Sequence, residues 1–228
     1  MTSTAGFQRA RSEEQREARR RAILAAATAM LAEMPVAQLS LNELSRRVGL
    51  AKSNVLRYFE SREAVLLELL DAALREWLDA LAAALPAAAD HTVAPDVRIE
   101  QVAAAIAGSA VARPTLCELI SASAAVLEHN VSATVATRYK RAATADAAVL
   151  GELVRAYIPE LTRPAANHFG AGTVLVLGAV WTHSSPSPGM QAAYEADPEL
   201  AALRLDFGRT LHDVLATLLA GLLARPPR

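Results

Sequence analysis

The chain has 228 residues, enough for one small and one larger domain, and 53% of them are hydrophobic while only 4% are aromatic. Its single cysteine, Cys117, excludes an internal disulfide and fits a reducing compartment. Residues 1–62 hold 11 Lys and Arg against 6 Asp and Glu, whereas residues 63–228 hold 12 against 18. This asymmetry indicates that only the N-terminal part contacts a polyanion.

The sequence shows no signal-peptide pattern, and the longest apolar run, Ala171–Trp181, is shorter than the ~18 residues that span a membrane. We therefore expect a cytoplasmic protein without membrane contact. Ala and Leu dominate while Gly is sparse, which favours an all-α fold of about nine helices.

Residues 1–12 have no apolar periodicity and are expected to form a disordered tail. A first helix is expected over about residues 13–33, because Ile23, Ala27 and Met30 fall on one stripe at the helical period. It would form the start of an N-terminal domain over residues 1–60, called the head below.

Two short helices joined by a tight turn are predicted within residues 40–59. Ser40 and Glu43 form a capping box that begins the first, and Gly49 can adopt the positive φ that ends it. Such a pair is typical of a helix-turn-helix, whose second helix enters the DNA major groove. The head is therefore predicted to be a DNA-binding domain. The side chains left facing outward on the second helix are Lys52, Ser53, Asn54, Leu56, Arg57 and Tyr58.

A long helix is predicted from Ser61 to about Leu85, with an apolar face wide enough to contact both the head and the rest of the chain. Residues 61–228, called the body below, are predicted to be a second, helical domain. Its five further helices are expected over about residues 96–112, 115–129, 132–157, 163–182 and 199–224, with a Ser/Pro-rich loop at 184–189.

The last two predicted helices are apolar nearly all round, and residues 164–194 contain no Asp, Glu, Lys or Arg. Such surfaces need a cover, which either the rest of the body or a second copy supplies. We predict a two-fold interface of four helices between two copies. The residues expected there are Phe169, Gly172, Val176, Val180, Leu203, Phe207, Leu211, Val214 and Leu218.

Residues 13–70 resemble the DNA-binding domain of TetR/AcrR-type transcriptional regulators. The resemblance rests on the pattern L-x-x-L-x-x-x-V-G-L-x-x-x-x-V-x-x-Y-F from Leu41 to Phe59, followed by Ser-Arg-Glu at the start of the long helix. It implies an all-α homodimer, without enzyme activity or cofactor, that a small-molecule effector releases from a palindromic operator in double-stranded DNA. By position it assigns DNA contacts to Ser40, Leu41, Lys52, Ser53, Asn54, Leu56, Arg57, Tyr58 and Arg62.

The resemblance has one departure, because Leu56 stands where the family often has a tyrosine that contacts a phosphate. Leucine offers no hydrogen bond there. Arg57 beside it could recover affinity by reading guanine with two hydrogen bonds. Whether Arg9, Arg11 and the run Arg19–Arg21 touch DNA stays open.

In this family the body encloses a ligand pocket, so the resemblance implies that residues 61–228 are an effector-binding and dimerisation domain. Polar residues that interrupt the apolar body helices are candidates for the pocket lining, although a lone polar residue on such a helix is more often an ordinary core or interface residue. The scarcity of aromatic residues favours an aliphatic or modestly polar effector. The candidates are Arg113, Glu118, Ser121, His129, Tyr139, His168 and Trp181.

No spacing of His, Cys, Asp or Glu predicts a metal site, and no phosphate-binding or nucleophile motif is present. Two alternatives to a ligand-released repressor remain. One is a regulator with the same head that answers to a protein partner or to no ligand. The other is an all-helical enzyme or ligand carrier with a coincidental helix-turn-helix, against which the basic head and the missing catalytic motif both count.

Overall fold

The computed structural model describes residues 3–225, with side chains from residue 13 onward except at 124 and 125. Within residues 3–225 the chain forms eleven α-helices and no strand, and nine of the helices have seven or more residues, so the predicted all-α fold is confirmed. The helices are α1 Ser3–Leu31, α2 Leu41–Arg47, α3 Lys52–Val55, α4 Arg62–Ala88, α5 Pro95–Val111, α6 Pro114–Ala125, α7 Ala133–Tyr157, α8 Arg163–Ser184, α9 Pro188–Ala196, α10 Pro198–Ala201 and α11 Phe207–Ala224, with 3-10 turns η1 Val36–Gln38 and η2 Leu127–Asn130.

Helices α1, α2 and α3 enclose the core of the head. Ile23, Met30, Leu44 and Val55 are fully buried in it, and Phe59 closes it. Helix α1 begins at Ser3, whereas the sequence predicted a tail over residues 1–12. The missing apolar stripe suggested a tail, but Ala, Arg and Gln in this stretch are good helix formers without needing to be buried. Residues 1 and 2 of the predicted tail lie outside the described residues.

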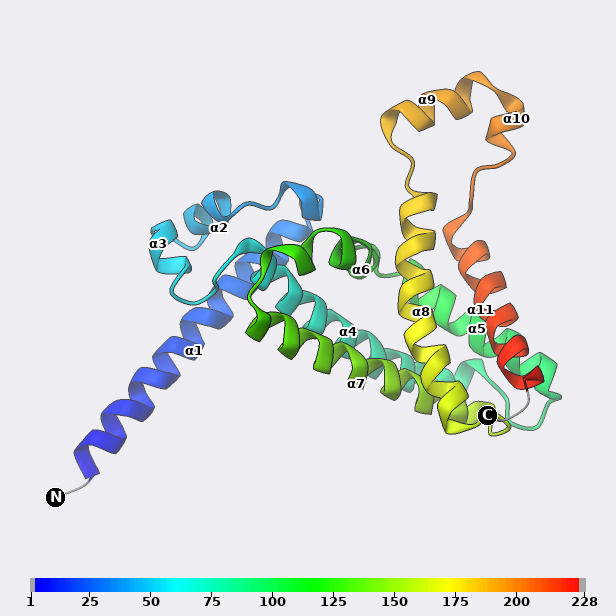
Figure 1. The fold of residues 1–228 in the computed structure, drawn as a ribbon, viewed down its shortest axis with the longest axis horizontal. Coiled ribbons are helices and arrows are strands. Elements are labelled where there is room, and N and C mark those ends of the chain that lie inside the picture. Colours follow the sequence, from blue (N-terminus) through cyan, green and yellow to red (C-terminus); the bar gives the residue numbers. More distant parts are fainter. Residues whose placement is uncertain (1–2, 226–228) are drawn as a thin grey trace.

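The long helix α4 joins the head to the body. It is capped by the Ser61 hydroxyl, which accepts a hydrogen bond from the Ala64 N–H at 3.0 Å, and it runs to Ala88 with Pro86 in its last turn. Leu66 and Leu70 are buried towards the head end, and Trp77 is buried towards the middle of the body. Helix α7 packs alongside α4, and α6 also packs against α4 (Figure 1).

Helix α8 packs against α6, α7 and α11, and α11 also packs against α5. The contact between α7 and α8 is a close backbone approach. A Cβ at Gly170 would lie 1.9 Å from the Ala147 carbonyl oxygen, and one at Gly151 would lie 2.5 Å from that of Ala166. Only glycine fits at these two positions, because the neighbouring atoms belong to backbone.

Residues 185–206 form an arm that projects from the body between α8 and α11 and carries α9 and α10 (Figure 1). The predicted single helix over 199–224 is therefore wrong, since α11 begins only at Phe207. Asp197 and Asp206 each cap a new helix with their carboxylate, and so they interrupt the apolar stripe that suggested one helix. Neither α9 nor α10 has a buried residue.

Candidate nucleic-acid interface and ligand cavity

The turn between α2 and α3 sets the position of the outward-facing residues. The Ser40 hydroxyl accepts a hydrogen bond from the Glu43 N–H at 3.2 Å and so begins α2, which is one half of the predicted capping box. The Glu43 carboxylate pairs instead with Arg46 and Arg47. Gly49 ends α2 with a φ of 64°, a left-handed conformation that glycine adopts at little cost. Helix α3 follows as one helical turn, and backbone hydrogen bonds continue the helical winding to Phe59. Residues 52–59 are called the recognition coil below.

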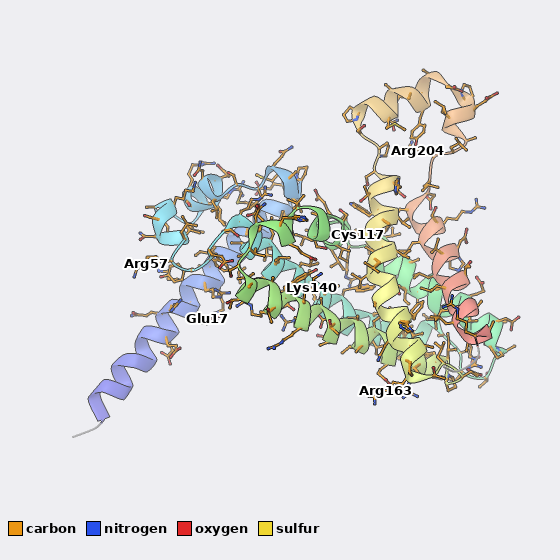
Figure 2. The ribbon with its side chains drawn as sticks, viewed as in Figure 1. Glu17, Arg57, Cys117, Lys140, Arg163 and Arg204 are labelled. Carbon is orange, nitrogen blue, oxygen red and sulfur yellow. The ribbon has the colours of Figure 1, made fainter. Side chains whose placement is uncertain are left out.

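This short coil exposes most of the side chains that the sequence assigns to DNA. Tyr58 is half-buried against the head core, and Leu56 is 41% exposed although it is apolar. Arg57 projects from the outer end of the head, away from the body (Figure 2). The exposed members of the set are Lys52, Ser53, Asn54, Leu56 and Arg57.

Arg57 also faces α1 across a groove. Arg16, Arg19 and Tyr58 line this groove with it, so the basic surface extends from α3 onto the first helix. Such a surface suits a phosphate backbone, because positive charge gathered along one side attracts it without reading sequence.

Arg20, the central member of the arginine run, points inward instead. Its guanidinium donates to the Tyr58 carbonyl oxygen at 2.9 Å, pairs with Glu68 of α4 and lies 4.3 Å from the centre of the Phe59 ring. Arg20 therefore fixes the end of the recognition coil against α4, while its neighbours Arg19 and Arg21 are exposed.

Arg62, which the resemblance assigns to DNA, is also engaged within the chain. Its guanidinium donates to the carbonyl oxygens of Leu39 at 3.1 Å and Ala37 at 3.3 Å, and it pairs with Glu63. These bonds hold the segment that leads into α2. Ser40 is exposed beside them, and Leu41 is half-buried.

A cavity of about 370 Å³ opens into the body between α4, α6, α7 and α8. Its floor is buried and mostly aliphatic, and its rim is exposed. The floor residues include Leu70, Leu74, Trp77, Leu78, Ile120, Ser123, Ala147 and Leu150, and the rim residues include Lys140, Thr144, Asn167, Ala171 and Leu175.

Of the seven predicted ligand-binding residues, only Tyr139 lines this cavity. The Glu118 carboxylate accepts instead from the Val36 N–H in the head at 2.8 Å, and Trp181 meets Phe207 edge to face at 5.1 Å. Polarity alone could not say which face of a helix turns towards the cavity. The other four do not line it either: Arg113 and Ser121 bond carbonyl oxygens of their own segments, and His129 and His168 are exposed.

Asp146 of α7 also lines the cavity, although it was not among the ligand-binding residues predicted from the sequence. Burial raises the pKa of its carboxyl group, the negative charge of Asp71 raises it further, and Arg75 partly offsets both. A signal was available, because Asp146 follows Tyr139 by seven residues and precedes Leu150 by four. All three therefore lie on one face of α7.

The nine predicted dimer residues divide into three groups by burial. Phe169, Val180 and Leu211 are buried within the protomer and so have little surface to give to an interface. Their helices have apolar stripes wide enough to face both the protomer core and the outside, and spacing cannot separate the two sides. Val214 and Leu203, the latter on the arm, are exposed, and four are half-buried: Gly172, Val176, Phe207 and Leu218.

Cys117 is buried, and its thiol donates to the Ala110 carbonyl oxygen at 3.4 Å. Burial raises the pKa of this thiol to about 12. A thiol that stays protonated at neutral pH is a poor nucleophile.

A three-helix head that exposes a basic coil after a glycine turn defines a helix-turn-helix DNA-binding protein. The description "Bacterial regulatory proteins, tetR family" matches residues 23–69, and "Tetracyclin repressor-like, C-terminal domain" matches residues 71–226. The chain therefore belongs to the TetR family, and the resemblance seen in the sequence is confirmed. This membership makes it a DNA-binding transcriptional regulator and points away from an enzyme.

Solved structures agree in fold. A TetR transcriptional regulator from Rhodococcus sp. RHA1 superposes with a TM-score of 0.56 at 14% identity, over 91% of this chain and 96% of its own. The TetR family repressor AlkX from Dietzia sp., implicated in biodegradation of n-alkanes, gives 0.51 at 12% identity, over 90% and 96%. A search of curated protein sequences found no match.

Proposed function

We propose that the protein is a homodimeric repressor that binds a palindromic operator and leaves it when a small molecule enters the body cavity. The observation that carries this proposal is the exposed polar coil of the head, where Lys52, Ser53, Asn54 and Arg57 all face solvent. Two such coils set one duplex turn apart, about 34–36 Å, would read a site with two-fold symmetry.

The outer faces of α8 and α11 support the dimer. Val214 of α11 is 37% exposed, and Gly172 and Val176 of α8 are only half-buried. By length and composition alone α11 could cross a membrane, and only 22% of it is buried within the protomer. A second copy would cover this surface as a four-helix interface, in keeping with a cytoplasmic DNA target. Val214→Glu should then give a monomer in sedimentation, whereas Ala82→Glu, at an exposed position of α4, should leave the dimer intact.

Three polar contacts between head and body would carry the signal from the cavity. Glu118 of α6 accepts from the Val36 N–H, and Glu60 accepts from the Ser132 N–H at 2.6 Å. Glu68 of α4 pairs both with Arg20 of the head and with Arg138 of α7. A ligand that displaces α6 or α7 would strain these contacts and turn the heads relative to each other, with an ordinary coupling of about 1–3 kcal/mol.

Gel shift with the DNA that flanks the gene tests the proposal. Lys52→Ala and Arg57→Ala should each weaken binding about 5- to 100-fold, the loss expected for one phosphate or bidentate base contact. Arg204→Ala on the arm removes the same charge far from the head and should leave affinity unchanged (Figure 2). Equal affinity of all three variants and the wild type would show that this coil does not contact DNA.

A regulator controlled by a protein partner, or by no ligand, remains the competing function. Release of the operator by a compound from a metabolite panel would favour the small-molecule form. If no compound releases the operator while a cell extract does so in a protease-sensitive manner, a protein partner takes its place.

A further inference from the structure

The chemistry of the cavity lining narrows the class of effector, and this inference rests on the proposed function. The floor is built from branched aliphatic side chains, among them Leu70, Leu74 and Leu150. The Trp77 N–H is already bonded to the Ser109 hydroxyl at 2.8 Å, so this indole offers the cavity only its apolar ring. Such a floor favours a hydrocarbon chain, because burial of aliphatic surface stabilises the complex without directional contacts.

Two cationic side chains near the floor of the cavity are each paired with a carboxylate. Lys140 at the rim pairs with Glu128 at 2.8 Å, and Arg75 pairs with Asp71 next to the cavity. Asp146 is the carboxylate that lines the cavity without an ion-pair partner among the described residues.

One oxygen of this carboxylate, Asp146 Oδ2, is buried and accepts no hydrogen bond from the described part of the protein. A buried carboxylate oxygen without a donor costs free energy, since water solvates it far better. Asp71 also brings a second negative charge close enough to raise the pKa of the Asp146 carboxyl group. Asp146 lines the cavity, so a positively charged donor that reaches its carboxylate would supply both the missing hydrogen bond and the missing charge at one point on an aliphatic wall.

We propose that the cavity binds a small aliphatic amine, with its ammonium group on Asp146 and its hydrocarbon chain on the leucines of α4 and α7. An ammonium group supplies both the missing donor and the missing charge. An alcohol would supply only a donor, and a carboxylate would meet two like charges. A flat aromatic cation is less suited, because Trp77 and Tyr139 are the aromatic residues in the lining.

Tryptophan fluorescence can test this preference with octylamine, octanol and octanoate as probes of equal chain length. The chain has two Trp, and Trp181 lies outside the lining, so a Trp181→Phe background leaves Trp77 as the reporter. Octylamine should bind about tenfold or more tightly than octanol, and octanoate should bind most weakly. Equal binding of octylamine and octanol, or tighter binding of octanoate, would overturn the proposal.

Asp146→Asn keeps the shape of the side chain and removes its charge. It should weaken octylamine binding about tenfold or more, leave octanol binding nearly unchanged and strengthen octanoate binding. Asp79→Asn, which removes an exposed carboxylate from α4 outside the cavity, should change none of the three. Unchanged octylamine affinity in Asp146→Asn would exclude the ion pair, and a melting temperature that is not lowered would show that the variant is folded.

The pH dependence gives a second measurement. The folded-state pKa of Asp146 is raised, so its carboxylate becomes protonated at a higher pH than an exposed one. Octylamine affinity should therefore fall as pH falls through that pKa, while octanol affinity should not. The other groups near Asp146 are the Asp71–Arg75 and Lys140–Glu128 pairs and Tyr139, and Asp146→Asn should abolish the pH effect if Asp146 carries it.

Gel shift in the presence of the same probes separates this inference from the proposed function. Octylamine that binds and releases the operator supports both. Octylamine that binds without releasing DNA supports the amine site and contradicts effector control. Release by octanoate or octanol, with weaker binding of octylamine, would keep effector control and overturn the amine site.

Discussion

The head and the body differ in which side chains they expose and which they bury. In the head the polar groups that matter are exposed, and the charged side chain that turns inward, Arg20, is fully engaged with Tyr58, Phe59 and Glu68. In the body the notable carboxylate, Asp146, is turned inward and lacks a partner, while apolar side chains such as Leu175 and Val214 face out.

This difference follows from what each part contacts. DNA is large and polar, so a surface of free donors on a rigid small core is sufficient to bind it. Binding of a second copy of the chain buries apolar surface, so the isolated protomer exposes that surface to water. Binding of a small ligand takes place in a cavity, where a buried polar group can stay without a partner until the ligand arrives. The body therefore resembles half of an assembly more than the head does.

The largest expected effect comes from a substitution that disturbs the packing of the body and leaves the head unchanged. Gly170→Ala would force a Cβ to within 1.9 Å of the Ala147 carbonyl oxygen, and α7 and α8 would have to separate. We expect a loss of about 3 kcal/mol in the free energy of unfolding. Urea denaturation followed by circular dichroism measures it.

Gly108→Ala is the matched control, because this glycine also lies within a helix but no atom beyond its own helix backbone and its chain neighbours lies within 4 Å of the position of its Cβ. Alanine there should stabilise the protein by about 0.5–1 kcal/mol through its higher helix propensity. A Gly170→Ala variant as stable as Gly108→Ala would show that α7 and α8 can separate without cost.

A smaller effect should follow from cutting one contact between the two regions. Glu118→Ala leaves the Val36 N–H, on a residue that is 3% exposed, without its acceptor. The expected cost is about 2 kcal/mol. Hydrogen exchange at residues 33–39 should accelerate, while exchange in α8 should not. Glu76→Ala on the exposed side of α4 is the control, and identical exchange in both variants would mean that the head does not depend on α6.

The smallest expected effect concerns Leu56, which is 41% exposed on the recognition coil. Leu56→Tyr adds a hydroxyl group that can donate to a phosphate, and operator affinity should rise by about 1 kcal/mol, roughly fivefold. Gel shift at two salt concentrations checks it. Leu56→Phe adds the ring without the hydroxyl, and an equal gain in both variants would assign the effect to ring contact alone.

The sequence predicted the head well because its elements depend on residues close together in the chain. The cap at Ser40, the positive φ of Gly49 and the buried stripe of Ile23, Ala27 and Met30 all follow from local rules. The inward turn of Arg20 and Arg62 was not predictable in this way. Each is held by partners such as Glu68 or Leu39 that tertiary packing brings near.

In the body the sequence predicted the helices but seldom their orientation. Tyr139 was found in the cavity lining, and Glu118 was expected there but reaches the head instead. The arm was missed because Leu200 and Leu203 continue the apolar spacing of α11, although Asp206 caps a separate helix. Periodicity reports that a helix has an apolar face, and it does not report which neighbour that face meets.

The shielded thiol of Cys117 has a practical consequence for measuring how the heads move. The chain has one Cys, and the raised pKa of about 12 keeps it protonated and slow to react with alkylating reagents at neutral pH. A cysteine introduced at exposed Ser53 could therefore be labelled selectively without removing the native one. In a dimer, two spin labels at that position would report the distance between recognition coils directly, with and without a ligand in the cavity.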